Sequence, residues 1–189
     1  MMMNMQKTDE SRLAPPQPDP IRLGAVTLGA PVFLAPMAGI TDLPFRRAVA
    51  RFGAGLVVSE MVASSEMVTT RPSPKASVLA RALTEGDTPV SVQIAGRESG
   101  PMAETARIIA GMGARIIDIN MGCPAKKVTG GLSGAALMRD LDHALGLIDA
   151  VVGAVDLPVT LKMRLGWDGD CLNAAELSAR ARDAGVQML

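Results

Sequence analysis

Short apolar runs alternate with longer segments of helical periodicity along most of the chain. Glycine, proline or polar residues bound each apolar run, which is typical of buried strands. Ahead of the first run, residues 21–28 alternate apolar with polar or small residues, as a short hairpin would. The predicted strands are residues 32–35, 56–59, 90–94, 115–119 and 159–163, and residues 186–189 predict the start of a sixth.

The segments between the strands carry signals of helix starts and stops. Asp42 is an N-cap candidate before an early Pro44. Asn173 with Glu176 three residues on resembles a capping box. The predicted helices run from Asp42 to Gly53, near residues 77–83, from Ser99 to Gly111 or Gly113, over residues 141–152, and from Asn173 to Gly185.

Strand and helix alternate at intervals of roughly 25–40 residues, the spacing of repeated βαβ units and a parallel sheet. A doubly wound nucleotide-binding sheet would show G-x-G-x-x-G after its first strand, where this chain has Pro-Met-Ala-Gly at residues 36–39. A (β/α)₈ barrel instead predicts chemically capable residues at the carboxyl ends of many strands. Such residues are Met37, Glu60, Gln93, Asn120, Lys162 and Arg164.

The sequence therefore predicts an α/β fold of the (β/α)₈ TIM-barrel type. It is expected as an incomplete barrel of about five βα units plus the start of a sixth strand, since a closed barrel needs eight. We expect residues 21–189 to be the N-terminal portion of a longer catalytic barrel, and residues 1–20 to be a disordered tail.

Composition narrows the class of protein. Hydrophobic residues make up 48% of the chain but aromatic residues only 2%, so aliphatic side chains and the 13 methionines must fill the core. Acidic and basic residues balance at 19 each, so any contact with nucleic acid must be local. The uncharged residues 23–40 are broken by Pro31 and Pro36, which argues against a membrane span. The first 20 residues lack the apolar core of a signal peptide, so a soluble cytoplasmic chain is expected.

The two cysteines are far apart and form no C-x-x-C pair, which argues against a disulfide scaffold and against a cysteine-built metal site. Cys123 lies in the run Asp-Ile-Asn-Met-Gly-Cys-Pro at residues 118–124, directly after a predicted strand. A buried structural cysteine and a functional thiol are equally compatible with this spacing. A nucleophile would need a nearby histidine, and the only one, His143, lies on a helix and is expected at the surface. If Cys123 is functional, the pattern favours a proton donor.

Other polar residues are also candidates for chemistry. Lys162 could form a Schiff base, donate to an electron-rich cofactor ring, or simply make a salt bridge at the barrel rim. Gln93 could bind a planar heterocycle through its donor and acceptor, or could satisfy backbone groups between strands. Lys126 and Lys127 suit a phosphate-rich substrate, although paired lysines in a loop are more often solvated. Cys171 and Trp167 are expected to be structural.

Four motifs together resemble the tRNA-dihydrouridine synthases, nearest their bacterial B-type branch. The resemblance extends from about Ile21 to Leu189, and the Asp-Ile-Asn-Met-Gly-Cys-Pro run is its most specific part. The motifs are Ala-Pro-Met-Ala-Gly-Ile-Thr-Asp at residues 35–42, Val-Gln-Ile-Ala-Gly at 92–96, the run at 118–127, and Leu-Lys-Met-Arg at 161–164.

The resemblance implies a flavoenzyme that binds FMN at the carboxyl face of the barrel, takes electrons from NADPH or NADH, and acts on tRNA. It implies that hydride passes from the flavin to C6 of a uridine flipped out of the tRNA, while Cys123 protonates C5. By position, Asn120 would lie between flavin and base, and Arg164 would contact the base or its phosphate. Pro36, Met37 and Ala38 would line the flavin ring, and Gln93 and Lys162 would bind its polar edge.

In that family, a histidine-containing sixth strand, phosphate-binding glycines and a helical tRNA-binding domain follow the region that corresponds to this chain. Two alternatives to the tRNA-modifying flavoenzyme therefore stay open. One is a related flavin- or lysine-dependent barrel that acts on a free pyrimidine or as an aldolase. The other is an inactive truncated fragment.

Overall fold

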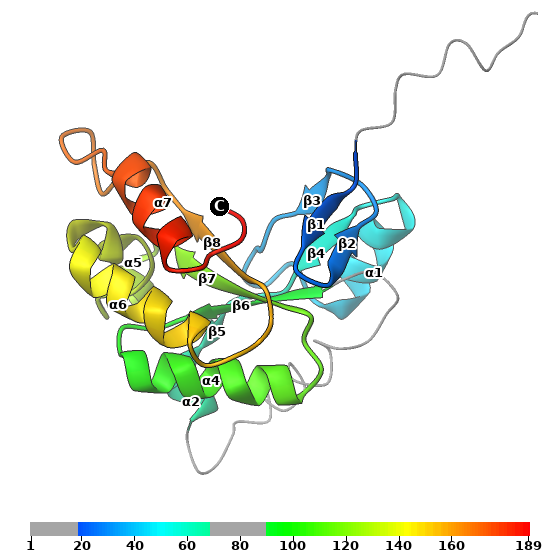
Figure 1. The fold of residues 1–189 in the computed structure, drawn as a ribbon, viewed down its shortest axis with the longest axis horizontal. Helices are drawn as coiled ribbons and strands as arrows, with labels where there is room; N and C mark the ends of the chain where they lie inside the picture. Colours follow the sequence, from blue (N-terminus) through cyan, green and yellow to red (C-terminus); the bar gives the residue numbers. More distant parts are fainter. Residues whose placement is uncertain (1–18, 69–89) are drawn as a thin grey trace, which may run out of the picture.

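The computed structural model describes residues 19–68 and 90–189. A curved parallel sheet in the strand order β3-β4-β6-β7-β8 forms its centre (Figure 1). The short β5 pairs in parallel with the end of β6. The strands are β3 (Phe33–Leu34), β4 (Leu56–Val58), β5 (Val62–Ala63), β6 (Val90–Ala95), β7 (Ile116–Met121) and β8 (Val159–Met163).

Helices follow these strands in sequence, as the alternating pattern predicts. Asp42 caps the helix that begins at Leu43 by accepting a hydrogen bond from the backbone N–H of Phe45. Asp140 caps the helix that begins at Leu141 in the same way, by accepting from the backbone N–H of His143. Gly53 and Gly185 follow helix ends with φ of 87° and 104°, a conformation that favours glycine. The helices are α1 (Leu43–Arg51), α2 (Ser64–Met67), α4 (Ser99–Gly111), α5 (Lys126–Thr129), the 3₁₀ helix η2 (Gly134–Arg139), α6 (Leu141–Val152) and α7 (Ala174–Asp183).

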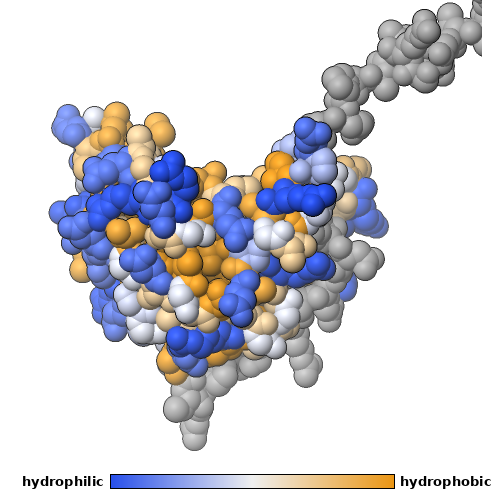
Figure 2. Space-filling view, viewed as in Figure 1, coloured by the Kyte–Doolittle hydropathy of each residue, from blue (hydrophilic) through white to orange (hydrophobic). Residues whose placement is uncertain are grey.

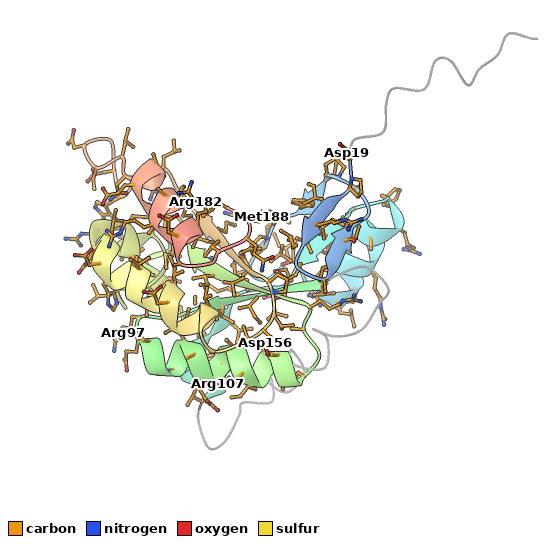
Figure 3. All side chains as sticks on the ribbon, viewed as in Figure 1. Asp19, Arg97, Arg107, Asp156, Arg182 and Met188 are labelled. Carbon is orange, nitrogen blue, oxygen red and sulfur yellow. The ribbon has the colours of Figure 1, made fainter. Side chains whose placement is uncertain are left out.

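The outer face of the sheet carries the main hydrophobic core. Ile117, Ile119 and Leu161 pack there with Met102 of α4, and Leu147 of α6 belongs to the same cluster. Helices α4, α6 and α7 all lie on this side (Figure 1). Arg97 lies at the amino-terminal end of α4, and Arg107 lies on the side of α4 away from the sheet (Figure 3). A doubly wound sheet would have helices on both faces, so this arrangement confirms the barrel-type prediction.

A hairpin covers the amino-terminal end of the inner face. It consists of β1 (Ile21–Leu23) and β2 (Val26–Leu28), which pair antiparallel as the alternation at residues 21–28 predicts. Its buried side chains pack against Leu56, Val58 and Ile116 of the sheet. The hairpin therefore fills the bottom of the curved sheet and leaves the carboxyl ends of the strands for the site.

The predicted sixth strand begins beside β8. Thr160 and Met188 form a parallel bridge, and the backbone N–H of Leu161 donates to the carbonyl of Met188 over 3.0 Å. This extension continues the parallel order of the sheet. The fold is thus an incomplete (β/α)₈ barrel, with successive strands paired in parallel and a sixth beginning at its β8 edge.

Two details differ from the sequence-based expectation, and two predicted segments fall wholly or mostly on residues that the structure does not describe. The capping box at Asn173 is wrong, because the Asn173 side chain donates instead to the carbonyl of Met138 over 2.7 Å and caps no N–H of α7. Asn120 lies within β7 rather than after it, because pairing with β8 continues to Met121. The predicted helix at residues 77–83 and residues 1–18 of the predicted tail at 1–20 lie outside the described residues. Within the described ranges, no helix is long and apolar enough to cross a membrane.

Candidate active site at the carboxyl ends of the strands

A layer of polar side chains crosses the inner face of the sheet. Gln93 of β6 is opposite Asp118 of β7, and Asp118 is opposite Thr160 of β8. Because paired residues of neighbouring parallel strands point to the same face, the three side chains meet. They are 1%, 6% and 3% exposed, respectively. Polar groups buried this deeply need hydrogen-bond partners, so their pairing largely decides the stability of the layer.

These side chains form a continuous chain of hydrogen bonds. The Thr160 hydroxyl donates to Oδ1 of Asp118 over 2.6 Å, and Nε2 of Gln93 donates to Oδ2 over 2.6 Å. Nδ2 of Asn120, itself only 8% exposed, donates to Oε1 of Gln93 over 2.8 Å. Both carboxylate oxygens of Asp118 therefore accept a hydrogen bond.

The carboxyl group of Asp118 is the charged member of this layer. Burial raises its pKa above the ordinary value of 3.8. Hydrogen bonds from Thr160 and Gln93 and the positive charge of Lys162 act in the opposite direction but do not cancel the effect of burial. Burying a carboxyl group in this way costs folding free energy. A carboxyl group that is nevertheless kept there is a candidate for a functional role.

The hydrogen-bond chain ends at the turn that carries Cys123. Oδ1 of Asn120 accepts from the backbone N–H groups of Gly122 and Cys123, over 3.2 and 3.0 Å. An asparagine side chain that bonds the backbone two or three residues on is a local turn device. Asn120 therefore fixes the path of the chain from the end of β7 to the thiol.

A second set of contacts holds Cys123 from the other side. The Cys123 carbonyl accepts from the backbone N–H of Ala135 over 3.0 Å. At Gly134, φ is +59°, and a Cβ atom there would lie 2.8 Å from the same carbonyl oxygen. Glycine is therefore required for η2 to approach the turn this closely. Cys123 itself is half-buried and is a free thiol.

Lys162 and the Cys123 turn lie at the same end of neighbouring strands. Lys162 is opposite Asn120 in the pairing of β7 and β8. A Cβ atom on Gly122 would lie 3.3 Å from the backbone of Met163, so the turn passes directly beside the end of β8. Lys162 is solvent-exposed. An exposed ammonium group therefore stands next to the anchored thiol segment, at the carboxyl edge.

An open cavity of about 610 Å³ occupies the inner face between the two sides of the curved sheet. Figure 2 shows a hollow with an apolar floor between more polar flanks, and Met188 lies in it (Figure 3). A volume of this size suits a cofactor or small ligand. Pro36, Asp118, Thr160, Lys162 and Arg164 all line the cavity. The sequence-predicted Pro36, Lys162 and Arg164 are thereby brought together.

The loop after β3 is held in place by Glu60, which follows β4, and by Arg46 of α1. Glu60 accepts from the backbone N–H of Gly39 through Oε2 over 3.0 Å. The buried Arg46 donates through Nη1 to the carbonyl of Thr41 over 2.6 Å. Burial lowers the pKa of Arg46, while the charges of Asp42 and Glu60 act in the opposite direction. The backbone directly after the predicted ring-lining segment, which includes Met37 and Ala38, is thus held at Gly39 and at Thr41.

The remaining predicted residues are spread more widely. Lys126 and Lys127 are exposed on α5, away from the residues that line the cavity. His143 is exposed on α6, as expected. Trp167 lies under the guanidinium of Arg139, 5.2 Å from the ring centroid, and packs against the core, which supports a structural role. Within the described ranges, no group of three potential metal ligands occurs.

The sequence pattern predicts no role for Asp118, Thr160 or Arg46. A signal was present for two of these residues, since Asp118 and Thr160 each stand between two aliphatic residues within their strands. Only the strand register reveals that they face each other and Gln93, because sequence alone does not align one strand with the next.

Comparison with known proteins identifies the family. The sequence model of the dihydrouridine synthase (Dus) family matches residues 33–189. The chain is 74% identical over 169 residues to a probable tRNA-dihydrouridine synthase of Rhodobacter capsulatus, covering 89% of this chain and 52% of that protein. It is 60% identical over 158 residues to a protein of the same name in Rhizobium leguminosarum, covering 84% of this chain and 49% of the relative.

A third relative carries the B-type name. The chain is 50% identical over 170 residues to tRNA-dihydrouridine synthase B of Pseudomonas aeruginosa, covering 89% of this chain and 50% of that protein. The chain thus spans about half the length of the curated relatives it matches. The family model and the relatives agree with each other and with the resemblance of the four motifs. The chain belongs to the dihydrouridine synthase family.

Proposed function

We propose that this chain forms part of a flavin-dependent enzyme that reduces the C5=C6 bond of uridines in tRNA to 5,6-dihydrouridine. The names of the relatives support the substrate and the reaction. The observation that carries the proposal is the hydrogen-bond chain that ends at Cys123, because it fixes a thiol at the carboxyl edge beside Lys162. A tRNA substrate implies work in the cytoplasm.

The residues present fit the ring end of FMN. The cavity is lined by Pro36 on one side and Lys162 on the other, and the backbone of Met37 and Ala38 continues from Pro36. Gln93 is 1% exposed and is not among the residues that line the cavity, but it retains one N–H and one lone pair beyond its bonds to Asp118 and Asn120. These would pair with the polar edge of a heterocycle that reaches this layer. When bound, FMN supplies the hydride, with NADPH or NADH as the reductant.

Lys162 would orient that ring by donating to its polar edge, and its positive charge would favour negative charge developing there. Cys123 would deliver a proton from its Sγ to C5 of the uracil. Asn120 would keep the Cys123 backbone in register with β8 through its bonds to the turn. The backbone of Cys123 is already held by its neighbours, so little reorganisation of the turn would accompany the proton transfer.

The RNA itself would be bound by residues outside the cavity floor. Arg164 lines the rim, and Lys126 and Lys127 are exposed directly after the Cys123 turn. These three cations lie on segments that follow the carboxyl ends of β7 and β8. They would contact phosphates on either side of a uridine drawn into the cavity.

The test compares two alanine variants of the only two cysteines in the chain. Cys123→Ala should keep the oxidation of NADPH by the flavin but lose about 10²- to 10⁴-fold in uridine reduction, the typical worth of one general acid. Cys171→Ala should keep both rates. The measurements are NADPH oxidation in single turnover and dihydrouridine formed in a tRNA transcript. They are made with this chain and with a fusion that adds the part of the Rhodobacter capsulatus relative outside the match.

Three outcomes would contradict the proposal. Dihydrouridine formed at the wild-type rate by Cys123→Ala would remove the acid assignment. Reduction of free uracil in place of tRNA would favour a pyrimidine oxidoreductase. A colourless fusion protein without a flavin absorption band would show that these residues do not hold FMN.

A further inference from the structure

Asp118 lies beneath the proposed catalytic thiol and is connected to it through two amide side chains. We propose that Asp118 is a positioning residue for Cys123, which fixes the direction of every hydrogen bond between them. This inference deepens the proposed function, on which it rests for the role of Cys123. It concerns a side chain that reaches the thiol only through Gln93 and Asn120.

The two ends of the hydrogen-bond chain have fixed polarity. An ionised carboxylate can only accept, and both oxygens of Asp118 do so. At the other end, the backbone N–H groups of Gly122 and Cys123 can only donate. The termini therefore demand a donor at one end and an acceptor at the other.

The two amides between these ends can each be turned in two ways. Gln93 must present Nε2 to Asp118, so its Oε1 faces Asn120. Asn120 must then present Nδ2 to Gln93, which leaves its Oδ1 facing the turn. A single combination of amide orientations satisfies all five hydrogen bonds, and the carboxylate of Asp118 selects it together with the N–H groups of the turn.

Loss of that charge would release the selection. With asparagine at position 118, the reversed orientation of Gln93 and Asn120 becomes available, because an amide can donate to Oε1 of Gln93. In the reversed state Nδ2 of Asn120 would face the N–H groups of Gly122 and Cys123, and donor would meet donor. In the fraction of molecules that adopt this reversed state the turn opens, and the thiol loses its fixed place beside β8.

The test measures the alkylation rate of Cys123 by iodoacetamide at one pH, by mass spectrometry, in a Cys171→Ser background with a single thiol. Asp118→Asn should react roughly two- to tenfold faster, the ratio expected when the net stabilisation of one hydrogen bond is lost. Thr160→Val is the matched control. It removes a donor to the same carboxylate but leaves the Gln93–Asn120 bonds intact, so its rate should be unchanged.

Moving the carboxylate from position 118 to position 93 distinguishes an effect of hydrogen-bond direction from an effect of side-chain packing. In the double variant Gln93→Glu with Asp118→Asn, the carboxylate moves one position along the chain of hydrogen bonds. Glutamate at 93 still accepts from Nδ2 of Asn120 and accepts from the amide at 118, while Thr160 still donates to that amide. The double variant should therefore return to the wild-type alkylation rate. Gln93→Glu alone places two buried carboxylates next to each other, so Cys123 should react fastest in that single variant.

Two results would overturn the inference. One is a folded Asp118→Asn variant, by circular dichroism, with the wild-type alkylation rate. The other is a double variant as reactive as Asp118→Asn alone. If the variants do not fold, hydrogen exchange in the unsubstituted chain decides, since the Gly122 and Cys123 amides should be protected and unprotected amides would refute the chain of bonds.

None of these measurements uses flavin, NADPH or tRNA. Failure of the proposed function would leave the alkylation pattern standing, and failure of the positioning role would leave the enzymatic assay of Cys123→Ala untouched.

Discussion

Alternate residues of β7 face two environments that differ in almost every respect except burial. Ile117 and Ile119 point outward into the hydrophobic core beneath the helices, whereas Asp118 and Asn120 point inward and join the hydrogen-bond chain. All four are buried. Burial of the outer pair stabilises the fold by removing apolar surface from water. Burial of the inner pair removes polar groups from water, and hydrogen bonds only partly offset that cost.

The same contrast separates stability from function. The outer face could belong to any (β/α) barrel, because its packing requires only aliphatic side chains of suitable size. The inner face requires particular hydrogen-bond donors and acceptors at particular positions. The hydrogen bonds of Asn120, at the end of this chain, hold the Cys123 turn. We therefore expect substitutions on the two faces to change different observables, and often in opposite directions.

The largest effect on stability should come from the outer face. Ile119→Ala should lower the free energy of unfolding by about 2–5 kcal/mol, because it leaves a cavity at a side chain with no solvent exposure. Ile119→Val, which removes one methylene group, should cost about 0.5–1.5 kcal/mol. Urea unfolding followed by circular dichroism measures both. If the two variants were equally stable, the outer face would not be the close-packed core described here.

A smaller and more local effect is expected where the inner face meets the Cys123 turn. Gly134→Ala places a side chain at a φ of +59° and a Cβ atom 2.8 Å from the Cys123 carbonyl oxygen. It should cost about 1–3 kcal/mol, the usual worth of a residue in a disfavoured backbone region. It should also change the alkylation rate of Cys123, because η2 can no longer approach the turn.

Gly146 provides the matched control for this substitution. It lies on the exposed side of α6, and a Cβ atom there meets nothing within 4 Å. Gly146→Ala should stabilise the chain by about 0.5–1 kcal/mol through its higher helix propensity and should leave Cys123 reactivity unchanged. Equal effects of the two substitutions in thermal unfolding would mean that the turn is not held by close approach.

Most of the outer face could be predicted from the sequence, whereas most of the inner network could not. Runs such as residues 159–163 give the strands directly, and caps such as Asp42 give the helix starts, because both signals are local. The partners of Asp118 come from strands 25 and 42 residues away, and they depend on register. The expected capping box at Asn173 failed for the same reason, because its amide finds a partner in η2, 35 residues away.

The motif at residues 118–124 illustrates the limit most clearly. Its spacing indicated that Cys123 follows a strand and left the thiol open between a functional and a structural role. The resemblance to the dihydrouridine synthases then supplied a role for Asn120 between flavin and base, and that contact stays a prediction. The structure adds that Asn120 also holds the turn, which no periodicity could indicate because the bonds depend on the rotamer of one side chain.

The smallest expected effect of an inner-face substitution on stability concerns Asp118, and its sign is opposite to that of Gly134→Ala. Its pKa is raised in the folded chain, so the folded state binds the proton more tightly than the unfolded state does. The contribution of Asp118 to stability is therefore greatest below its ordinary pKa of 3.8 and is lost as the pH rises through the folded pKa. At neutral pH the buried charge opposes folding, and a neutral isostere should relieve that cost.

Asp118→Asn should accordingly melt slightly above the wild-type chain at neutral pH, and the difference should narrow as the pH is lowered toward the ordinary pKa. Differential scanning calorimetry of both proteins at matched pH values measures this, since other titrating groups contribute equally to each. Asp149→Asn, at an exposed carboxylate on α6, is the control and should show no comparable rise. A lower melting temperature for Asp118→Asn at neutral pH would mean that the hydrogen bonds of the inner layer outweigh the burial of its charge. Both faces would then stabilise the fold. They would differ only in that the inner face does so through directional hydrogen bonds between specific partners and the outer face through apolar packing.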